Sequence, residues 1–221
     1  MKELLSIIDH TNLKPDAVWN DIFKLCNEAK EYGFGAVCVN GRFVKKAAEE
    51  LRGSSVKVAA VAGFPLGAEA SEVKAYEASL AVENGAQEID MVLSVGALKE
   101  GNFPYVRKDI YMTTEAVKGK AIVKVILETC FLTDEEIITA CKICEEAGAD
   151  FVKTSTGFNG PGADVHHVRL MKKTVGDRLK VKAAGGIRTL KQAMDMIEAG
   201  ADRLGCSASV AIAKEILTNG R

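Results

Sequence analysis

The chain has 221 residues, with 29 Lys and Arg against 30 Asp and Glu, and a formal net charge of −1. Its length fits a single domain, 1–221, and a hydrophobic fraction of 48% can supply a sizeable core. The even charge balance argues against a nucleic-acid partner, which would require a basic face. Uncharged runs are too short to cross a membrane, and the first residues carry no secretion signal, so we expect a cytoplasmic protein with no membrane partner.

Short apolar segments alternate with amphipathic ones along the whole chain. We predict strands near 7–10, 35–39, 56–62, 87–93, 121–127, 150–154, 180–184 and 202–206. Helices are predicted at 15–32, 41–52, 68–84, 103–117, 133–147, 163–175, 189–199 and 207–218. Strands and helices that alternate with short connections produce parallel sheets with right-handed crossovers. Eight such units favour a single (β/α)8 TIM barrel of the α/β class, and a doubly wound open sheet is the alternative.

The junctions between helices and strands follow a common pattern. Each has a glycine suited to the left-handed cap at the end of a helix, followed by an apolar strand. If the strands start in register, the residues five positions after these glycines lie at similar depth in the barrel. Counting from Gly33, Gly85, Gly119, Gly148 and Gly200 reaches Cys38, Asp90, Lys124, Lys153 and Gly205.

Four of the apolar segments carry one isolated charge. They are EIDMVLS with Asp90, AIVKVILE with Lys124, DFVKTST with Lys153 and LKVKAAGG with Lys182. A charge in a buried strand is costly unless it is paired or loses its charge. A lysine in an apolar pocket beside other cations loses its proton easily and becomes a nucleophile that can form a Schiff base with a carbonyl.

These residues allow more than one interpretation. Lysines near strand ends are commonly surface residues with solvated ammonium groups. Lys124 has a further alternative, which is to neutralise Asp90 or Glu128 inside the barrel. The residues alone do not decide which lysine attacks.

Glycines follow the last two predicted strands, where barrels frequently bind phosphate. Gly185 and Gly186 follow one strand, and Gly205 and Ser207 follow the other, just before a helix whose N-terminus favours an anion. Turns also need glycine, so a role in a turn is the simpler interpretation of each glycine taken alone. Together they favour a phosphate site. No metal-ligand spacing occurs, and we predict no metal. The six cysteines are expected to be reduced.

With these residues assembled, the chain resembles the deoxyribose-phosphate aldolases, a family of class I aldolases that act through a Schiff base. The resemblance covers nearly the whole chain, and its most specific motifs are FVKTSTGF (151–158) and KAAGGIRT (182–189). It also includes IDHTNLKPDA (8–17), AVCVN (36–40), VAGFPLGA (61–68), EIDMVLSVGALKEG (88–101) and KVILETCFLTDEE (124–136).

The resemblance implies a TIM barrel that cleaves 2-deoxy-D-ribose 5-phosphate to D-glyceraldehyde 3-phosphate and acetaldehyde in deoxyribonucleoside catabolism, without a cofactor. It implies that Lys153 forms the imine and that Lys182 and Asp90 handle protons. Phosphate would be held by Gly157, Gly185, Gly186, Gly205 and Ser207. The residues expected to support the pocket are Lys124, Cys38 and Thr156.

The chain differs from the family pattern at three places. Gly41 stands where proline is frequent, and Ala208 stands where a second serine is usual. The chain ends in Asn219-Gly220-Arg221 where some members have a mobile tail with a terminal tyrosine, so we do not expect tail-assisted proton transfer. The alternatives are another Schiff-base phosphosugar aldolase or transaldolase, and a barrel that binds a phosphorylated ligand without catalysis. The partner expected is a small phosphosugar, and a homodimer is left open.

Overall fold

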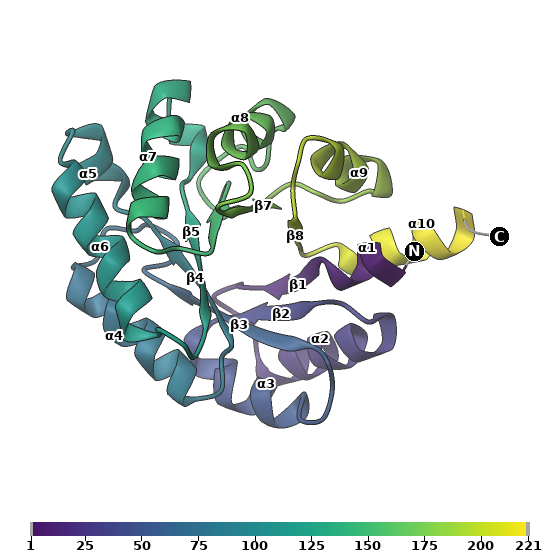
Figure 1. Ribbon diagram of the computed structural model, residues 1–221. Helices are drawn as coiled ribbons and strands as arrows, with labels where there is room; N and C mark the ends of the chain where they lie inside the picture. Colours follow the sequence, from purple (N-terminus) through teal and green to yellow (C-terminus); the bar gives the residue numbers. More distant parts are fainter. Residues whose placement is uncertain (1, 220–221) are drawn as a thin grey trace.

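The strands form one closed barrel of eight parallel strands in chain order, as the computed structural model of residues 2–219 shows (Figure 1). This confirms the predicted (β/α)8 TIM barrel and excludes the open sheet. The strands are β1 (Ile8–Asn12), β2 (Ala36–Val39), β3 (Lys57–Ala62), β4 (Glu88–Val92), β5 (Ile122–Ile126), β6 (Phe151–Lys153), β7 (Lys180–Ala184) and β8 (Arg203–Cys206).

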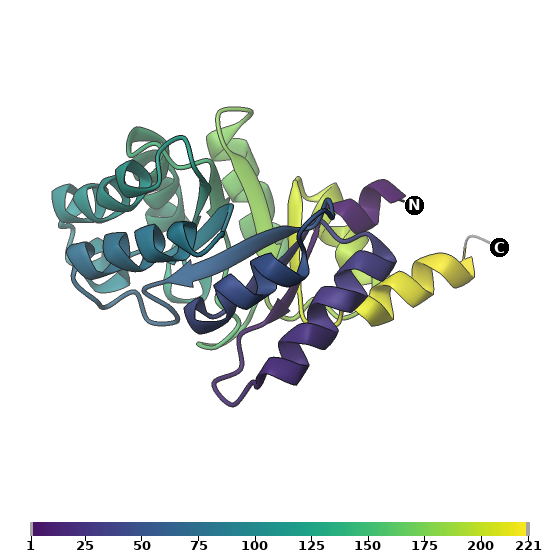
Figure 2. The same cartoon turned by 90° about the horizontal axis from the view of Figure 1, so that it is seen from below.

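Helices surround the barrel, and each predicted helix is present within a few residues of its predicted bounds (Figures 1 and 2). The α-helices are α1 (Lys2–Ser6), α2 (Trp19–Tyr32), α3 (Val44–Glu50), α4 (Ser71–Glu83), α5 (Val95–Lys99), α6 (Phe103–Ala116), α7 (Asp134–Glu146), α8 (Val165–Val175), α9 (Leu190–Glu198) and α10 (Ser209–Asn219). Two short 3-10 helices are η1 (Gly41–Phe43) and η2 (Thr129–Phe131).

The differences from the predicted elements have local causes. The helices α1 and α5 were not predicted, because a helix of five residues is too short to show an apolar repeat. The predicted start of α2 at residue 15 is four residues early. A turn closes first, with the Ala17 amide donating to the Lys14 carbonyl, and Asp21 then caps the helix by accepting from the Val18 amide at 2.9 Å.

The two faces of the barrel wall differ in chemistry. The outward side chains are apolar and form one core with the surrounding helices; they include Ile8, Val37, Val58, Ile89, Val125, Val152, Val181 and Leu204. Five strands instead carry charged inward side chains, namely Asp9, Asp90, Lys124, Lys153 and Lys182. The continuous apolar runs in the sequence therefore hold the strands to the helices, while the isolated charges line the interior.

The strand register sets where these charges meet. Asp90 is paired with Lys124 across β4 and β5, and Lys153 is paired with Lys182 across β6 and β7. Lys124 pairs with Phe151, two residues before Lys153. The predicted equal depth therefore holds for Asp90 and Lys124, but not for Lys124 and Lys153 on the next strand. The stagger of a closed barrel causes this offset.

The first and last helices of the described residues, α1 and α10, lie on the same side of the molecule in both views (Figures 1 and 2). The expectation about the terminal tail falls partly on residues 220 and 221, which lie outside the described residues. No helix in the described part of the chain is both long and apolar enough to span a bilayer.

Candidate active site

Asp90 is the meeting point of three lysines inside the barrel. Its Oδ2 lies 2.8 Å from Nζ of Lys153 and 2.7 Å from Nζ of Lys182, and its Oδ1 lies 2.8 Å from Nζ of Lys124. Asp90, Lys124 and Lys182 are fully buried, and Lys153 is 4% exposed. Residues from strands far apart in the sequence therefore share one carboxylate, and Lys153 and Lys182 share one of its oxygens.

Three further charged residues extend this cluster: Asp9 on β1, Glu88 on β4 and Arg203 on β8. Asp9 pairs with Lys182 and with Nε of Arg203, the latter at 3.0 Å. Glu88 pairs with Lys124 at 2.6 Å and with Arg203. The connected cluster thus holds three carboxylates (Asp9, Glu88 and Asp90) and four basic groups (Lys124, Lys153, Lys182 and Arg203). Its charges balance when one amine is neutral.

The pKa shifts identify the amine that is easiest to deprotonate. Burial would lower the pKa of Lys182, but Asp9 and Asp90 hold this pKa above its ordinary value. Burial acts on Lys124 in the same direction, and Asp90 raises the pKa of Lys124 above the usual range. For Lys153, burial and the nearby Lys182 cation outweigh Asp90, so the pKa of Lys153 is lowered.

The carboxylate at the centre stays ionised. Burial alone would raise the pKa of Asp90, but Lys124, Lys153 and Lys182 hold it well below its usual range. Asp90 therefore holds a negative charge beside Lys153 whether or not that amine is protonated. An anion in this position can stabilise a cation that forms on the Lys153 nitrogen.

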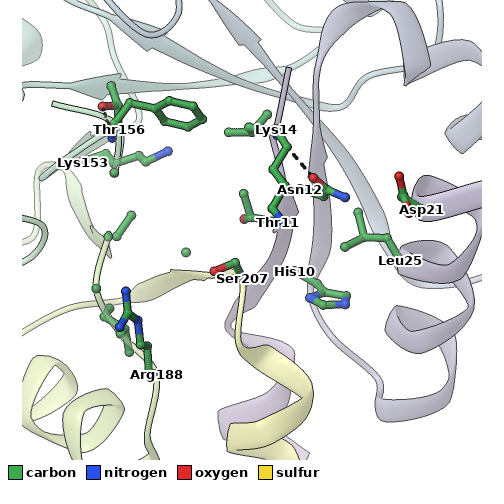
Figure 3. A pocket seen from close by; sticks show the side chains of 18 of the residues that line it. His10, Thr11, Asn12, Lys14, Asp21, Leu25, Lys153, Thr156, Arg188 and Ser207 are labelled. Carbon is green, nitrogen blue, oxygen red and sulfur yellow. Dashed lines mark hydrogen bonds between the residues drawn. The ribbon is translucent and has the colours of Figure 1, made fainter. Parts of the chain in front are cut away.

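Lys153 opens onto a cavity of about 580 Å3 at the carboxyl ends of the strands. In Figure 3 its side chain points into the space that Ser207 enters from the loop between β8 and α10. The lining also includes Lys14 and Arg188, two cations on the loops after β1 and β7. A buried amine with a lowered pKa therefore faces a chamber that is large enough for a small phosphosugar.

Glycines shape the wall of this cavity. Gly185 and Gly186 have φ values of 90° and 77°, which favour glycine, and both line the cavity. A side chain at Gly205 would come within 2.9 Å of Ala184 Cβ and 3.1 Å of Lys182 Cε. Gly205 therefore leaves room for the Lys182 side chain, in addition to lining the cavity.

Comparison with known proteins agrees with this geometry. The model of the DeoC/LacD aldolase family matches residues 4–215 of the chain. The chain belongs to the DeoC/LacD aldolase family. It is 56% identical to a deoxyribose-phosphate aldolase of Carboxydothermus hydrogenoformans, over 98% of this chain and 96% of that relative. It is 58% identical to one of Aciduliprofundum boonei, over 96% of each chain.

Solved structures of such aldolases have the same fold. A deoxyribose phosphate aldolase from Aeropyrum pernix, described as a tetramer, matches with a TM-score of 0.91 and 33% sequence identity. The match covers 99% of this chain and 93% of that one. The family membership that the KTSTG and GGIRT motifs suggested is therefore confirmed, over nearly the whole length.

The structure brings the predicted residues of this family member together in two layers. Residues that line the cavity are Lys153, Thr156, Gly157, Gly185, Gly186, Gly205 and Ser207. Asp90, Lys124 and Lys182 lie beneath them and do not line the cavity, so Asp90 meets it only through Lys153. Cys38 is fully buried in the same interior, and burial raises the pKa of its thiol to about 11.

The alternative partners considered for Lys124 are now distinguished. Lys124 pairs with Asp90, as expected, but not with Glu128. Its second close partner is Glu88, at the first position of β4. Glu128 accepts hydrogen bonds from Thr156 and Asn159 instead. Of the two alternative partners, Asp90 is therefore the one that the structure shows. Glu128 is not a partner, because it lies past the end of β5 while the Lys124 side chain lies deeper in the barrel.

Sequence reasoning missed several charged residues of the site. Asp9 follows only two apolar residues and precedes His10, Thr11 and Asn12, so it does not stand as an isolated charge inside an apolar run in the way that Asp90 does. Glu88 and Arg203 occupy the first positions of their strands, where charged residues are common, so no signal marked them. Lys14 and Arg188 stand within quoted motifs but on loops, where only the fold shows that they face the cavity.

Proposed function

We propose that this protein is a deoxyribose-phosphate aldolase in which Lys153 forms a Schiff base with the C1 aldehyde of 2-deoxy-D-ribose 5-phosphate. The observation that carries the proposal is the Lys153 amine, which has a lowered pKa, lies 2.8 Å from Asp90 and opens onto the cavity. The family membership and the relatives named deoxyribose-phosphate aldolase favour this substrate over other phosphosugars.

The reaction follows from the arrangement of charges. The neutral Lys153 amine attacks C1 and water leaves, which gives a protonated imine beside the Asp90 carboxylate. The imine withdraws electrons, so the C2–C3 bond breaks when the C3 hydroxyl loses its proton. Because Asp90 and Lys182 lie beneath the cavity, the proton reaches them through a water, and the two residues relay it. Glyceraldehyde 3-phosphate leaves, the enamine is protonated at C2, and addition of water releases acetaldehyde.

The glycine-lined end of the cavity suits the phosphate group. Backbone amides can approach an anion closely at Gly185 and Gly186, and Ser207 and Arg188 offer further donors beside them. Binding the phosphate fixes the sugar so that C1 lies at the Lys153 amine, which converts binding free energy into orientation. No step in this sequence calls for a cofactor.

A trapping experiment tests the proposal. Borohydride with acetaldehyde should add one ethyl group to Lys153, located by peptide mass spectrometry, and the Lys153→Leu variant should remain unlabelled. Labelling of Lys182 or Lys124 instead would show that the nucleophile is assigned incorrectly. A barrel that only binds a phosphorylated ligand would not be labelled, and a different phosphosugar aldolase would prefer another short donor to acetaldehyde.

The proposal also covers the domain organisation, location, partner and assembly of the protein. We infer that residues 1–221 act as one catalytic domain in the cytoplasm, in deoxyribonucleoside catabolism, with a small phosphosugar rather than a nucleic acid as partner. A homodimer is one possible assembly, and a tetramer, as described for the relative from Aeropyrum pernix, is the other. Sedimentation equilibrium of the purified protein distinguishes the two.

A further inference from the structure

Glu128 is a buried carboxyl group that the reaction proposed for Lys153 does not use. It follows β5 and is 2% exposed. Its backbone has φ 55° and ψ 61°, and it is the one non-glycine residue with positive φ within 2–219. A side chain in this left-handed region is strained and persists only where its surroundings hold it. The contacts of Glu128 must therefore hold it in this conformation.

The carboxyl group of Glu128 receives hydrogen bonds only from the loop that follows Lys153, among the donors of the described residues. Its Oε1 accepts from the Thr156 amide at 3.1 Å. Its Oε2 accepts from the Thr156 hydroxyl and from Nδ2 of Asn159, the latter at 2.9 Å. The Thr156 hydroxyl in turn accepts from the Phe158 amide at 3.1 Å. One carboxyl group thus fixes both ends of the turn formed by residues 156–159.

The opposite side of the same loop rests on the predicted phosphate site. A side chain at Gly162 would lie 2.1 Å from the Gly185 carbonyl oxygen, and one at Gly185 would lie 2.9 Å from Gly162 Cα. The Ala163 amide donates to the Gly185 carbonyl at 3.0 Å. A side chain at Gly157 would likewise lie 3.7 Å from Gly185 Cα. The loop and Gly185 are therefore in backbone contact, so a shift of one displaces the other.

We propose that Glu128 is a positioning residue for the phosphate end of the cavity. By anchoring Thr156 and Asn159 it holds the loop after β6 against Gly185, and so sets the spacing between Gly157 and the amides at Gly185 and Gly186. This proposal rests on the proposed function, because it assigns the phosphate of the substrate to that end. Glu128 does not touch the reacting carbons, and its effect reaches them through the loop.

The variant Glu128→Gln tests this role with little change in shape. An amide has one acceptor oxygen and one NH2 donor. In one orientation of the glutamine amide, its NH2 group faces the Thr156 backbone N–H, and in the other orientation it faces Nδ2 of Asn159. In both cases a donor faces another donor, so at least one hydrogen bond is lost. We expect the kcat/KM ratio of 2-deoxyribose 5-phosphate to unphosphorylated 2-deoxyribose to fall about tenfold, through KM.

Labelling of Lys153 by acetaldehyde and borohydride provides the second readout, because acetaldehyde has no phosphate. We expect the labelling rate of Glu128→Gln to stay within about twofold of the wild-type rate. The matched control is Glu135→Gln, an exposed carboxylate at the start of α7, which should change neither readout. An unchanged substrate ratio in Glu128→Gln, or equal losses on both sugars together with slower labelling, would overturn the proposal.

A second variant covers the case in which Glu128→Gln does not fold. Asn159→Ala removes one donor to Glu128, together with the Asn159 hydrogen bond to the Pro65 carbonyl, and keeps the Thr156 contacts. The same substrate ratio should therefore fall at least about threefold, which is the effect of losing one hydrogen bond. An unchanged ratio in that variant overturns the proposal as well. Failure to label Lys153 in the wild-type protein would instead refute the Schiff-base function itself, whereas labelling with an unaltered ratio refutes only the role of Glu128.

Discussion

Lys74 and Lys153 are both buried and both bond to a carboxylate, yet their surroundings differ. Lys74 on α4 has Asp109 on α6 to itself at 2.7 Å, and it also donates to the Val92 carbonyl at 3.0 Å. Lys153 shares the carboxylate of Asp90 with Lys124 and Lys182. The Lys74 pair lies between helices and does not line the cavity that Lys153 faces.

The difference shows what distinguishes a structural lysine from a reactive one. Burial disfavours the charge of any lysine, and one dedicated carboxylate compensates for it. When several cations compete for the same carboxylate, the one with the weakest compensation loses its proton most easily. Competition around Asp90, together with access to a cavity, therefore matters more than burial alone.

Removing the competitor should have the largest effect. In Lys182→Leu, Asp90 keeps two lysines instead of three, so the pKa of Lys153 should rise and its labelling by acetaldehyde should shift to higher pH. Loss of the proton carrier should also lower turnover by about 100-fold or more. Folding should persist, because Asp9 retains Arg203 at 3.0 Å, and circular dichroism checks this. Unchanged turnover would refute the role of Lys182.

Removing the shared carboxylate should shift the pH dependence in the opposite direction. In Asp90→Asn the group that raises the pKa of Lys153 is gone, so its labelling should begin at lower pH than in the wild type. Turnover should still fall by about 100-fold, because the C3 hydroxyl loses its proton acceptor. Shifts of the same sign in the Lys182→Leu and Asp90→Asn variants would contradict the competition described here.

The structural lysine offers the contrasting variant. Lys74→Met leaves Asp109 buried without its cation, which should lower the free energy of unfolding by about 3–5 kcal/mol in urea titrations. Burial already raises the pKa of Asp109, and this loss of the cation raises it further. Because the folded state then binds the proton more tightly than the unfolded state, the deficit should be larger at pH 7 than near about pH 4.

The pH profile of Lys153 labelling should be the same in Lys74→Met as in the wild type, wherever the variant is folded. A changed profile would mean that the two buried lysines are coupled through the barrel wall. This result would weaken the distinction between them.

A helix cap remote from both lysines should have the smallest effect. The Thr133 side chain accepts from the Glu136 amide at 3.3 Å, and Glu136 accepts from the Thr133 amide at 2.8 Å, which starts α7. Thr133→Ala should lower the free energy of unfolding by about 1 kcal/mol and leave turnover unchanged. A large loss of turnover would show that the site depends on more of the scaffold than the residues named here.

Much of the fold could be predicted from the sequence, because apolar strand segments alternate with amphipathic helical segments, and glycines mark the ends of the helices. The isolated charges at Asp90, Lys153 and Lys182 were also visible, since a charge in an apolar strand is rare. Their partners were not. The pairing of Lys124 with Glu88 depends on strand register, and that of Lys74 with Asp109 depends on how two helices pack. Neither is encoded by local pattern.

The role proposed for Glu128 is hidden from sequence for the same reason. Nothing in Leu127-Glu128-Thr129 indicates a left-handed residue, and its partners lie 28 and 31 positions away. Contacts between loops at the barrel mouth follow from closure of the barrel, which brings the ends of β5, β6 and β7 together. Local propensities contain no information about them.

Competition for Asp90 lowers the pKa of the Lys153 amine where it faces the cavity. The most direct measurement is the pH dependence of the initial rate at which acetaldehyde and cyanoborohydride label Lys153 in the wild-type protein, read by peptide mass spectrometry. The account predicts a midpoint clearly below that of an ordinary lysine, about 10.4. A midpoint at or above the ordinary value would contradict it.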